Sequence, residues 1–340
     1  MIKKLPLVFL SFLASSALAY DFRLIAEQHV VPGYQQLGET TASLVSVAGH
    51  YCDNQNETSM NKLQSAYRDA FSSWQSVQHI RFGPIQYLSR EHRFEMWPDK
   101  RGSVGKHLAR LAEDAAITQA DFDISTKSVA VQGFPALERL IFSGKSIDSQ
   151  RCALINAISA NLHNIAQNLL NDWMQGDEAF AEFFITAGQG NDIYESATEL
   201  AGQILNSLYT QLEFIATQKL DRPLGKDSNK ARGKRAEGWR SQSSLSAIEA
   251  NLAATQQLYQ LVFSGKLSKI LDGKISKAYQ QAMSNLATIK MPLHQAVSSP
   301  EQRERVMSFR KQLSVLKSLI GRDLAAELEL SLGFNSLDGD

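Results

Sequence analysis

The sequence predicts an all-α protein built as two antiparallel helical-bundle domains, residues 21–146 and 147–340. Apolar residues recur at spacings of three and four over long stretches, as from Leu63 to Trp74, which is typical of the buried face of a helix. No stretch combines alternating apolar residues with the turn residues of a β-hairpin. The chain has 340 residues, more than the ~250–300 that one hydrophobic core usually serves, which favours two domains.

Residues 1–19 have the pattern of a cleavable signal peptide rather than of a folded element. Two lysines are followed by an apolar run over residues 5–13 and by the small residues of Ala17-Leu18-Ala19. The apolar run is too short to anchor the chain in a bilayer, and no cysteine follows it for lipid attachment. We therefore expect an exported, periplasmic protein whose mature chain has no transmembrane anchor.

Composition narrows the classes of partner. The 35 basic and 35 acidic residues balance, so net charge offers no reason to expect a nucleic-acid partner. Cys52 and Cys152 are the two cysteines, and an even number in an exported protein predicts a disulfide between them. Unpaired buried thiols are the alternative.

In the first domain, the helix marked by Leu63 and Trp74 ends near Gly83-Pro84, because both residues interrupt helices. We expect an irregular connection over residues 85–100. Two further helices are predicted at 103–114 and at 121–143, the second broken at Gly133-Phe134-Pro135.

The second domain begins with a helix from about residue 149 to Trp173, and a long pattern after Gly176 extends to Ile215. Helices are also expected after Trp239-Arg240-Ser241 and at 267–289 and 300–320. Residues 157–162 and 247–252 agree at five of six positions. This echo is consistent with internal duplication of the bundle, and coincidence is the alternative.

Residues 221–238 carry many basic side chains and no helical periodicity. We interpret this basic loop as solvated, with contact to an anion or an acidic partner as the alternative.

The stretch Val131–Phe142 joins a backbone break to a helix with a carboxylate on its apolar face. Gly133 tolerates a turn, and Pro135 suits the first turn of a helix because its missing N–H would be unpaired there anyway. Glu138 then shares a face with Phe134 and Ile141. A buried carboxylate must be paired, hydrogen-bonded, metal-bound or neutral. The alternative is that Glu138 simply favours the positive end of the helix dipole.

Two histidines, His79 and His92, are candidate site residues. His92 and Glu95 form an H-x-x-E pair, but charged neighbours in an irregular segment favour a solvated loop. His79 ends a well-defined helix beside Arg81, so it is either a cation at the helix terminus or part of a site.

Four motifs give the chain a resemblance to the imelysin-like family, exported bacterial proteins with two helical bundles. They are Arg81-Phe82-Gly83-Pro84, Trp97-Pro98-Asp99, Gly133 to Phe142, and Trp239-Arg240-Ser241 with Asn251-Leu252. The family is implicated in iron acquisition, some members are called metallopeptidases, and a G-x-H-x-x-E motif is proposed as its site near the domain junction.

Carried over to this chain, Gly133 matches the motif glycine and Glu138 the glutamate, whereas Pro135 stands at the histidine position. Proline offers no ligand atom, which argues against metallopeptidase activity. Glu138 is then the single predicted metal ligand, and His79, Arg81, Trp239 and Arg240 complete the candidate site.

The resemblance therefore predicts a non-enzymatic binding or accessory component of bacterial iron uptake. Its expected ligands are iron, another divalent metal or an iron chelate, and its expected partner is an envelope protein. The alternatives are a metal-dependent peptidase that uses Glu138 as base, and an architectural envelope protein without a ligand.

Overall fold

The computed structural model describes residues 20–176 and 179–333. The predicted signal peptide lies outside the described residues. Those residues form helices and connecting turns with no strand, which confirms the all-α prediction. None of the described helices is long and apolar enough to cross a bilayer.

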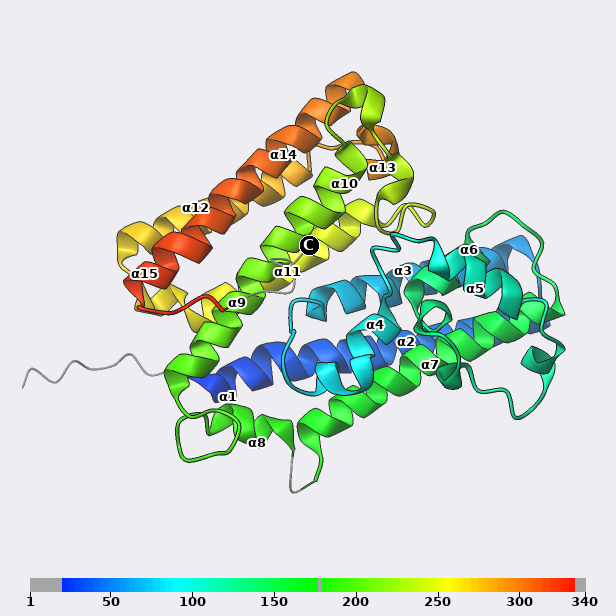
Figure 1. Cartoon of the computed structure of the whole chain (residues 1–340), viewed down its shortest axis with the longest axis horizontal. Coiled ribbons are helices and arrows are strands. Elements are labelled where there is room, and N and C mark those ends of the chain that lie inside the picture. The colour runs from blue at the N-terminus through cyan, green and yellow to red at the C-terminus, as the bar shows by residue number, and fades with distance from the viewer. Residues whose placement is uncertain (1–19, 177–178, 334–340) are drawn as a thin grey trace, which may run out of the picture.

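The first group of helices surrounds α2 (Val31–Asp53), which packs along α3 (Glu57–Val77) on one side and α7 (Ser149–Met174) on the other (Figure 1). The predicted stripe of α3 is buried, including Leu63, Tyr67 and Trp74. Asn56 caps α3 through its side chain. Shorter helices complete the group: α1 (Phe22–Ile25), α4 (Arg90–Phe94), α5 (Ser103–Leu111), α6 (Phe134–Ile141) and α8 (Phe180–Ile185).

The second group is formed by the long helices α9 (Ala197–Phe214), α11 (Ser244–Val262), α12 (Lys269–Leu286) and α14 (Pro300–Ser318), with α10 (Arg222–Leu224), α13 (Leu293–Ala296) and α15 (Ala325–Glu327) as short pieces (Figure 1). α12 packs on α14, and α11 packs on α3 of the first group. The α3–α11 contact therefore joins the two groups.

The predicted domain boundary falls between α6 and α7. In the structure, α7 packs against α2 and α6 of the first group, whereas the sequence predicts it as the first helix of the second domain. Because α8 also packs on α7 and α1, we propose a boundary after Ile185 in place of the one after residue 146.

Two segments differ from their predicted local structure. Residues 121–143 are not one broken helix: two 3₁₀ turns, Ile124–Thr126 and Val129–Val131, precede α6. Residues 85–100 are not wholly irregular either, because a 3₁₀ segment, Gly83–Ser89, leads directly into α4. Short turns of this kind carry too few residues for apolar periodicity to identify them.

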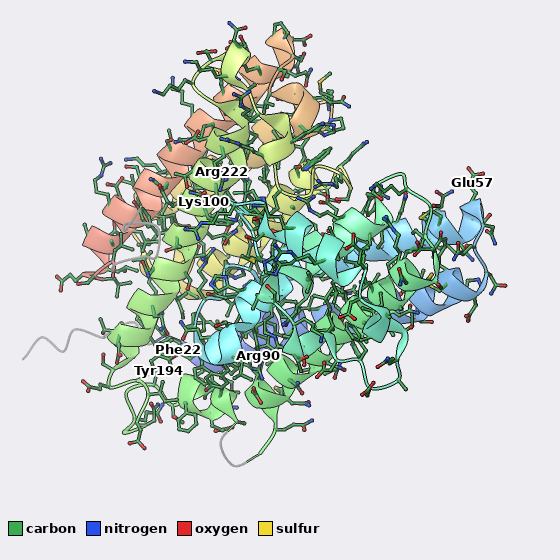
Figure 2. All side chains as sticks on the ribbon, turned by 45° about the vertical axis from the view of Figure 1, so that its right-hand side comes forward. Phe22, Glu57, Arg90, Lys100, Tyr194 and Arg222 are labelled. Carbon is green, nitrogen blue, oxygen red and sulfur yellow. A yellow bond between two sulfur atoms is a disulfide. The ribbon has the colours of Figure 1, made fainter. Side chains whose placement is uncertain are left out.

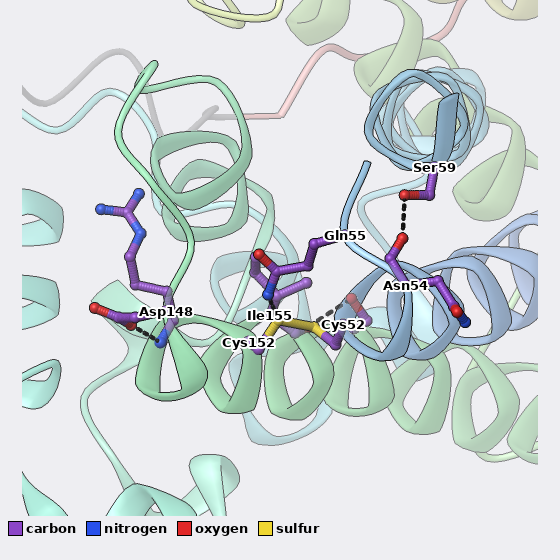
Figure 3. Close-up of a disulfide and its surroundings, with 9 residues drawn as sticks. Cys52, Asn54, Gln55, Ser59, Asp148, Cys152 and Ile155 are labelled. Carbon is purple, nitrogen blue, oxygen red and sulfur yellow. Dashed lines mark hydrogen bonds between the residues drawn. A yellow bond between two sulfur atoms is a disulfide. The ribbon is translucent and has the colours of Figure 1, made fainter. Parts of the chain in front are cut away.

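A disulfide joins Cys52 near the end of α2 to Cys152 in the first turn of α7, with Cα atoms 5.6 Å apart (Figure 3). Gln55 Nε2 lies 3.6 Å from Cys152 Sγ. The bond links two helices that also pack along each other, 100 residues apart in sequence.

The two echo segments lie on α7 and α11. In each, the buried asparagine donates to the backbone carbonyl of a glutamine: Asn161 Nδ2 to Gln132 at 3.0 Å, and Asn251 Nδ2 to Gln75 at 2.6 Å. The asparagine of the repeated sequence therefore makes the same type of hydrogen bond in both helices.

Candidate functional site

A small pocket, which we call the interface pocket, lies where α3, α6, residues 95–104 and the basic loop 221–238 meet. Its volume is about 140 Å³. Four residues of the predicted site line it: Pro135, Glu138, Trp239 and Arg240. Figure 2 labels Lys100 and Arg222, which mark the two segments that approach each other at the pocket.

α6 begins where it does because the chain passes very close to α4. A Cβ on Gly133 would lie 2.2 Å from the carbonyl oxygen of Phe94 and 2.5 Å from that of Arg93, so a larger residue does not fit. Pro135 follows in the first turn of α6, one position later than predicted, where it still costs no helical hydrogen bond. The close approach sets α6 so that Glu138 faces the basic loop.

Glu138 is buried and hydrogen-bonded. Its Oε1 accepts from both the backbone N–H and the hydroxyl of Ser241, each at 2.9 Å. Its Oε2 lies 3.8 Å from Arg240 Nη1, too far for a hydrogen bond. Burial raises the pKa of the Glu138 carboxyl, although Ser241 and Arg240 both oppose this rise.

Cations cover the two tryptophans of the pocket. The Arg240 guanidinium lies 4.3 Å from the centre of the Trp239 ring, and Lys234 Nζ lies 5.5 Å from the same ring. Arg222 lies 6.0 Å from the centre of the Trp97 ring. Together with Pro135 and Glu138, these residues mean that three of the four motifs behind the family resemblance line one pocket.

His79 and Arg81 do not line the pocket. His79 Nε2 lies 2.8 Å from His29 Nε2, and His29 Nδ1 lies 3.0 Å from Gln257 Oε1. Arg81 reaches Gln211 and the ring of Phe214 instead. The structure thus brings Glu138, Trp239 and Arg240 together and leaves His79 and Arg81 in other contacts.

Glu95 is a pocket residue that sequence reasoning assigned to a solvated loop, and that assignment was wrong. It is buried, and its Oε2 accepts from Trp74 Nε1 at 2.7 Å and from the amides of Gln75 and Gln78 at 3.0 Å each. Burial and the neighbouring Glu237 carboxylate raise the pKa of Glu95 well above its ordinary value. Burial and the neighbouring carboxylate thus both favour the protonated form of Glu95.

Glu237 and Lys219 form a buried ion pair behind Glu95, with Nζ 2.8 Å from Oε2. Lys219 Nζ also donates to Gln75 Oε1 at 2.5 Å and to Asn251 Oδ1 at 2.6 Å. Lys219 belongs to the π-helical segment Ile215–Asp221 that continues α9. One sequence signal could have found it: Lys219 interrupts the apolar stripe that precedes it at helical spacing.

The pocket does not supply the ligands of a transition-metal centre. Within the described ranges, no group of three or more His, Cys, Asp or Glu side chains is arranged to hold a metal ion. Glu138 offers one carboxylate whose first oxygen is already engaged by Ser241. Such centres in proteins usually have three or four protein ligands.

The chain is similar in sequence and in structure to imelysin-like proteins. Residues 30–320 match the family model described as Imelysin. Iron-regulated protein A of Synechococcus elongatus is 19% identical over 312 residues, covering 88% of this chain and 83% of that protein. The structure of an imelysin-like protein from Psychrobacter arcticum covers 92% of this chain and 96% of its own, with a TM-score of 0.77 and 20% identity. A structure from Parabacteroides distasonis, provisionally described as an iron-regulated protein A precursor, covers 88% and 94%, with a TM-score of 0.71 and 15% identity.

Proposed function

The chain belongs to the imelysin family, and from this premise we propose that it is a periplasmic, non-enzymatic binding component of bacterial iron uptake whose ligand occupies the interface pocket. The supporting observation is the meeting of Glu138, Trp239 and Arg240 in one pocket. Glu138 is about 100 positions from Trp239 and Arg240 in sequence, and these residues come from two of the segments that carry the family resemblance. The iron connection is supported by the name of the Synechococcus relative.

The pocket chemistry favours binding over hydrolysis. A metal-dependent peptidase needs a metal-bound water beside a free general base. Pro135 supplies no ligand, and Ser241 holds one oxygen of Glu138 by two hydrogen bonds. The peptidase alternative predicts hydrolysis of a peptide library that is lost on chelation and in Glu138→Gln.

The test combines growth with metal analysis. A strain lacking the protein should grow poorly when iron is scarce and normally when iron is added. Wild type should restore growth, Glu138→Ala should not, and Glu249→Ala should, because Glu249 is an exposed carboxylate on α11 outside the pocket. Ferrous, ferric and zinc ions and a ferric chelate are titrated into the purified protein in parallel.

Unchanged growth of the deletion strain under iron starvation, together with no affinity for iron or for the chelate, would overturn the proposal. Glu138→Ala that lowers stability but changes neither growth nor binding would favour the architectural alternative.

A further inference from the structure

We propose that the interface pocket recognises a small carboxylate-rich anion, taken either as the free organic acid or as its ferric complex, through the basic side chains at its rim. These rim cations are Arg139, Arg222, Lys234 and Arg235. The inference rests on the proposed function for the location of the site, and it adds the chemical class of the ligand.

The acidic side chains that line the pocket already have contacts of their own. Glu95 accepts hydrogen bonds from three side chains of α3 and its end, Glu237 is paired with Lys219, and Glu138 accepts two hydrogen bonds and faces Arg240. Asp99 accepts from the backbone N–H groups of Ser103 and Val104 at the start of α5. Among the described residues, none of these carboxyl groups forms an ion pair with a rim cation.

The rim cations have no acidic partner in the part of the chain that the structure describes. Among the described residues, none of the four forms an ion pair, and the single hydrogen bond from their side chains is that of Arg222 Nη1 to Gln218 Oε1 at 3.4 Å. Burial lowers the pKa of Arg222 and of Arg240, and the neighbouring charges of Arg235 and Arg139 lower them further. The rim is thus a group of mutually repelling positive charges, and a bound anion relieves that repulsion.

Two of the cations are held in place before any ligand arrives. Arg222 lies over Trp97 and Lys234 over Trp239, and both tryptophans are pocket walls. Held side chains lose less rotamer freedom when a ligand binds, which raises affinity.

Size and donor geometry select the class of anion. A volume of about 140 Å³ admits a small molecule and not a folded peptide. The planar fork of arginine matches the two oxygens of a carboxylate. Oxygen-rich organic acids are also ligands suited to hard metal ions, which connects the free acid to its ferric complex.

The probes are citrate, ferric citrate and inorganic phosphate, each titrated calorimetrically into the purified mature protein. We expect saturable binding of citrate or ferric citrate, stronger than that of phosphate and weakened by salt. Arg139→Gln and Arg235→Gln should each weaken it roughly tenfold or more. Arg232→Gln is the matched control, because Arg232 is an exposed residue of the same basic loop that does not line the pocket.

Absence of saturable binding by both carboxylate probes, equal weakening in Arg232→Gln, or tighter binding of phosphate would each overturn this inference. An iron-dependent growth phenotype without carboxylate binding would leave the proposed function standing and reject only the ligand class. Citrate binding without any growth phenotype would support the ligand class and reject the role in iron uptake. Comparison of citrate with ferric citrate identifies which form is recognised.

Discussion

Two buried polar clusters lie beside α3, one along the helix and one at its end. One consists of an ion pair and the other of a hydrogen bond between two histidines. The first cluster, which we call the pocket floor, is the ion pair of Lys219 and Glu237, 2.8 Å apart and both buried. Glu237 lines the pocket, whereas Lys219 does not and donates to Gln75. The histidine pair, His29 and His79, is neutral at pH 7 because burial lowers the pKa of both imidazoles. The cluster beside the pocket therefore contains buried charges, whereas the histidine cluster contains a hydrogen bond between neutral groups.

The neutral pair has one consistent arrangement of protons. Gln257 Oε1 accepts from His29 Nδ1–H, which leaves His29 Nε2 to accept from His79 Nε2–H. A proton added to either ring would disturb this arrangement, since His79 Nδ1 is buried and has no partner among the described residues. The charged floor instead depends on ion pairing, so removal of a single partner should have a larger effect there.

The strongest test of the comparison is Lys219→Met. It leaves the Glu237 carboxylate buried without its cation, and we expect the free energy of unfolding to fall by about 3–5 kcal/mol. Chemical denaturation monitored by circular dichroism measures this loss.

Lys226→Met is the control, because Lys226 is exposed in the basic loop, and its effect should stay below about 0.5 kcal/mol. The double variant Lys219→Met with Glu237→Gln should regain at least half of the lost stability. A loss for Lys219→Met as small as that for Lys226→Met would mean that the floor is not held by charge.

The histidine pair should make stability depend on pH in a defined direction. Burial lowers the pKa of His29 from 6.5 to about 4, so the unfolded chain binds protons more readily between these values. Stability should therefore be full above pH 6.5 and fall as the pH drops toward 4, by about 3 kcal/mol from His29.

Urea denaturation measures the free energy of unfolding of wild type and of His29→Gln at several pH values. The difference between the two proteins at each pH gives the contribution of His29. The raised pKa values of Glu95 and Glu138 have the opposite effect on stability as the pH falls. Both carboxyl groups bind a proton more tightly in the folded protein than in the unfolded chain. If wild type and His29→Gln lost stability in parallel as the pH fell, the neutral pair would not be the source.

The smallest expected effect is that of Glu138→Gln. An amide oxygen can still accept from Ser241, and the Arg240 contact at 3.8 Å is weak, so the cost should be about 1 kcal/mol. Ser241→Ala, which removes one donor, should cost a similar amount in the same denaturation assay. A loss of several kcal/mol for Glu138→Gln would instead place Glu138 with Lys219 among the residues that depend on charge pairing.

Sequence reasoning predicted the helical fold and the place of Glu138 on the apolar face of its helix, because both follow from local spacing. It missed Glu95 because its burial depends on Trp74 and Gln75, some twenty positions away, and not on its own neighbours. It likewise missed Glu237, whose partner Lys219 lies on a different element. Pairings across elements leave little trace in a single sequence, whereas a charge within an apolar stripe, as at Lys219, does leave one.

The bond between Cys52 and Cys152 has a consequence for damage to the chain. It closes a covalent ring that contains α3, α4, α5 and α6, and with them Glu95 and Glu138 of the pocket. A single protease cut anywhere between residues 53 and 151 would open this ring without separating the two pieces. The segments that carry half of the pocket would stay attached to α2 and α7 even after such a cut.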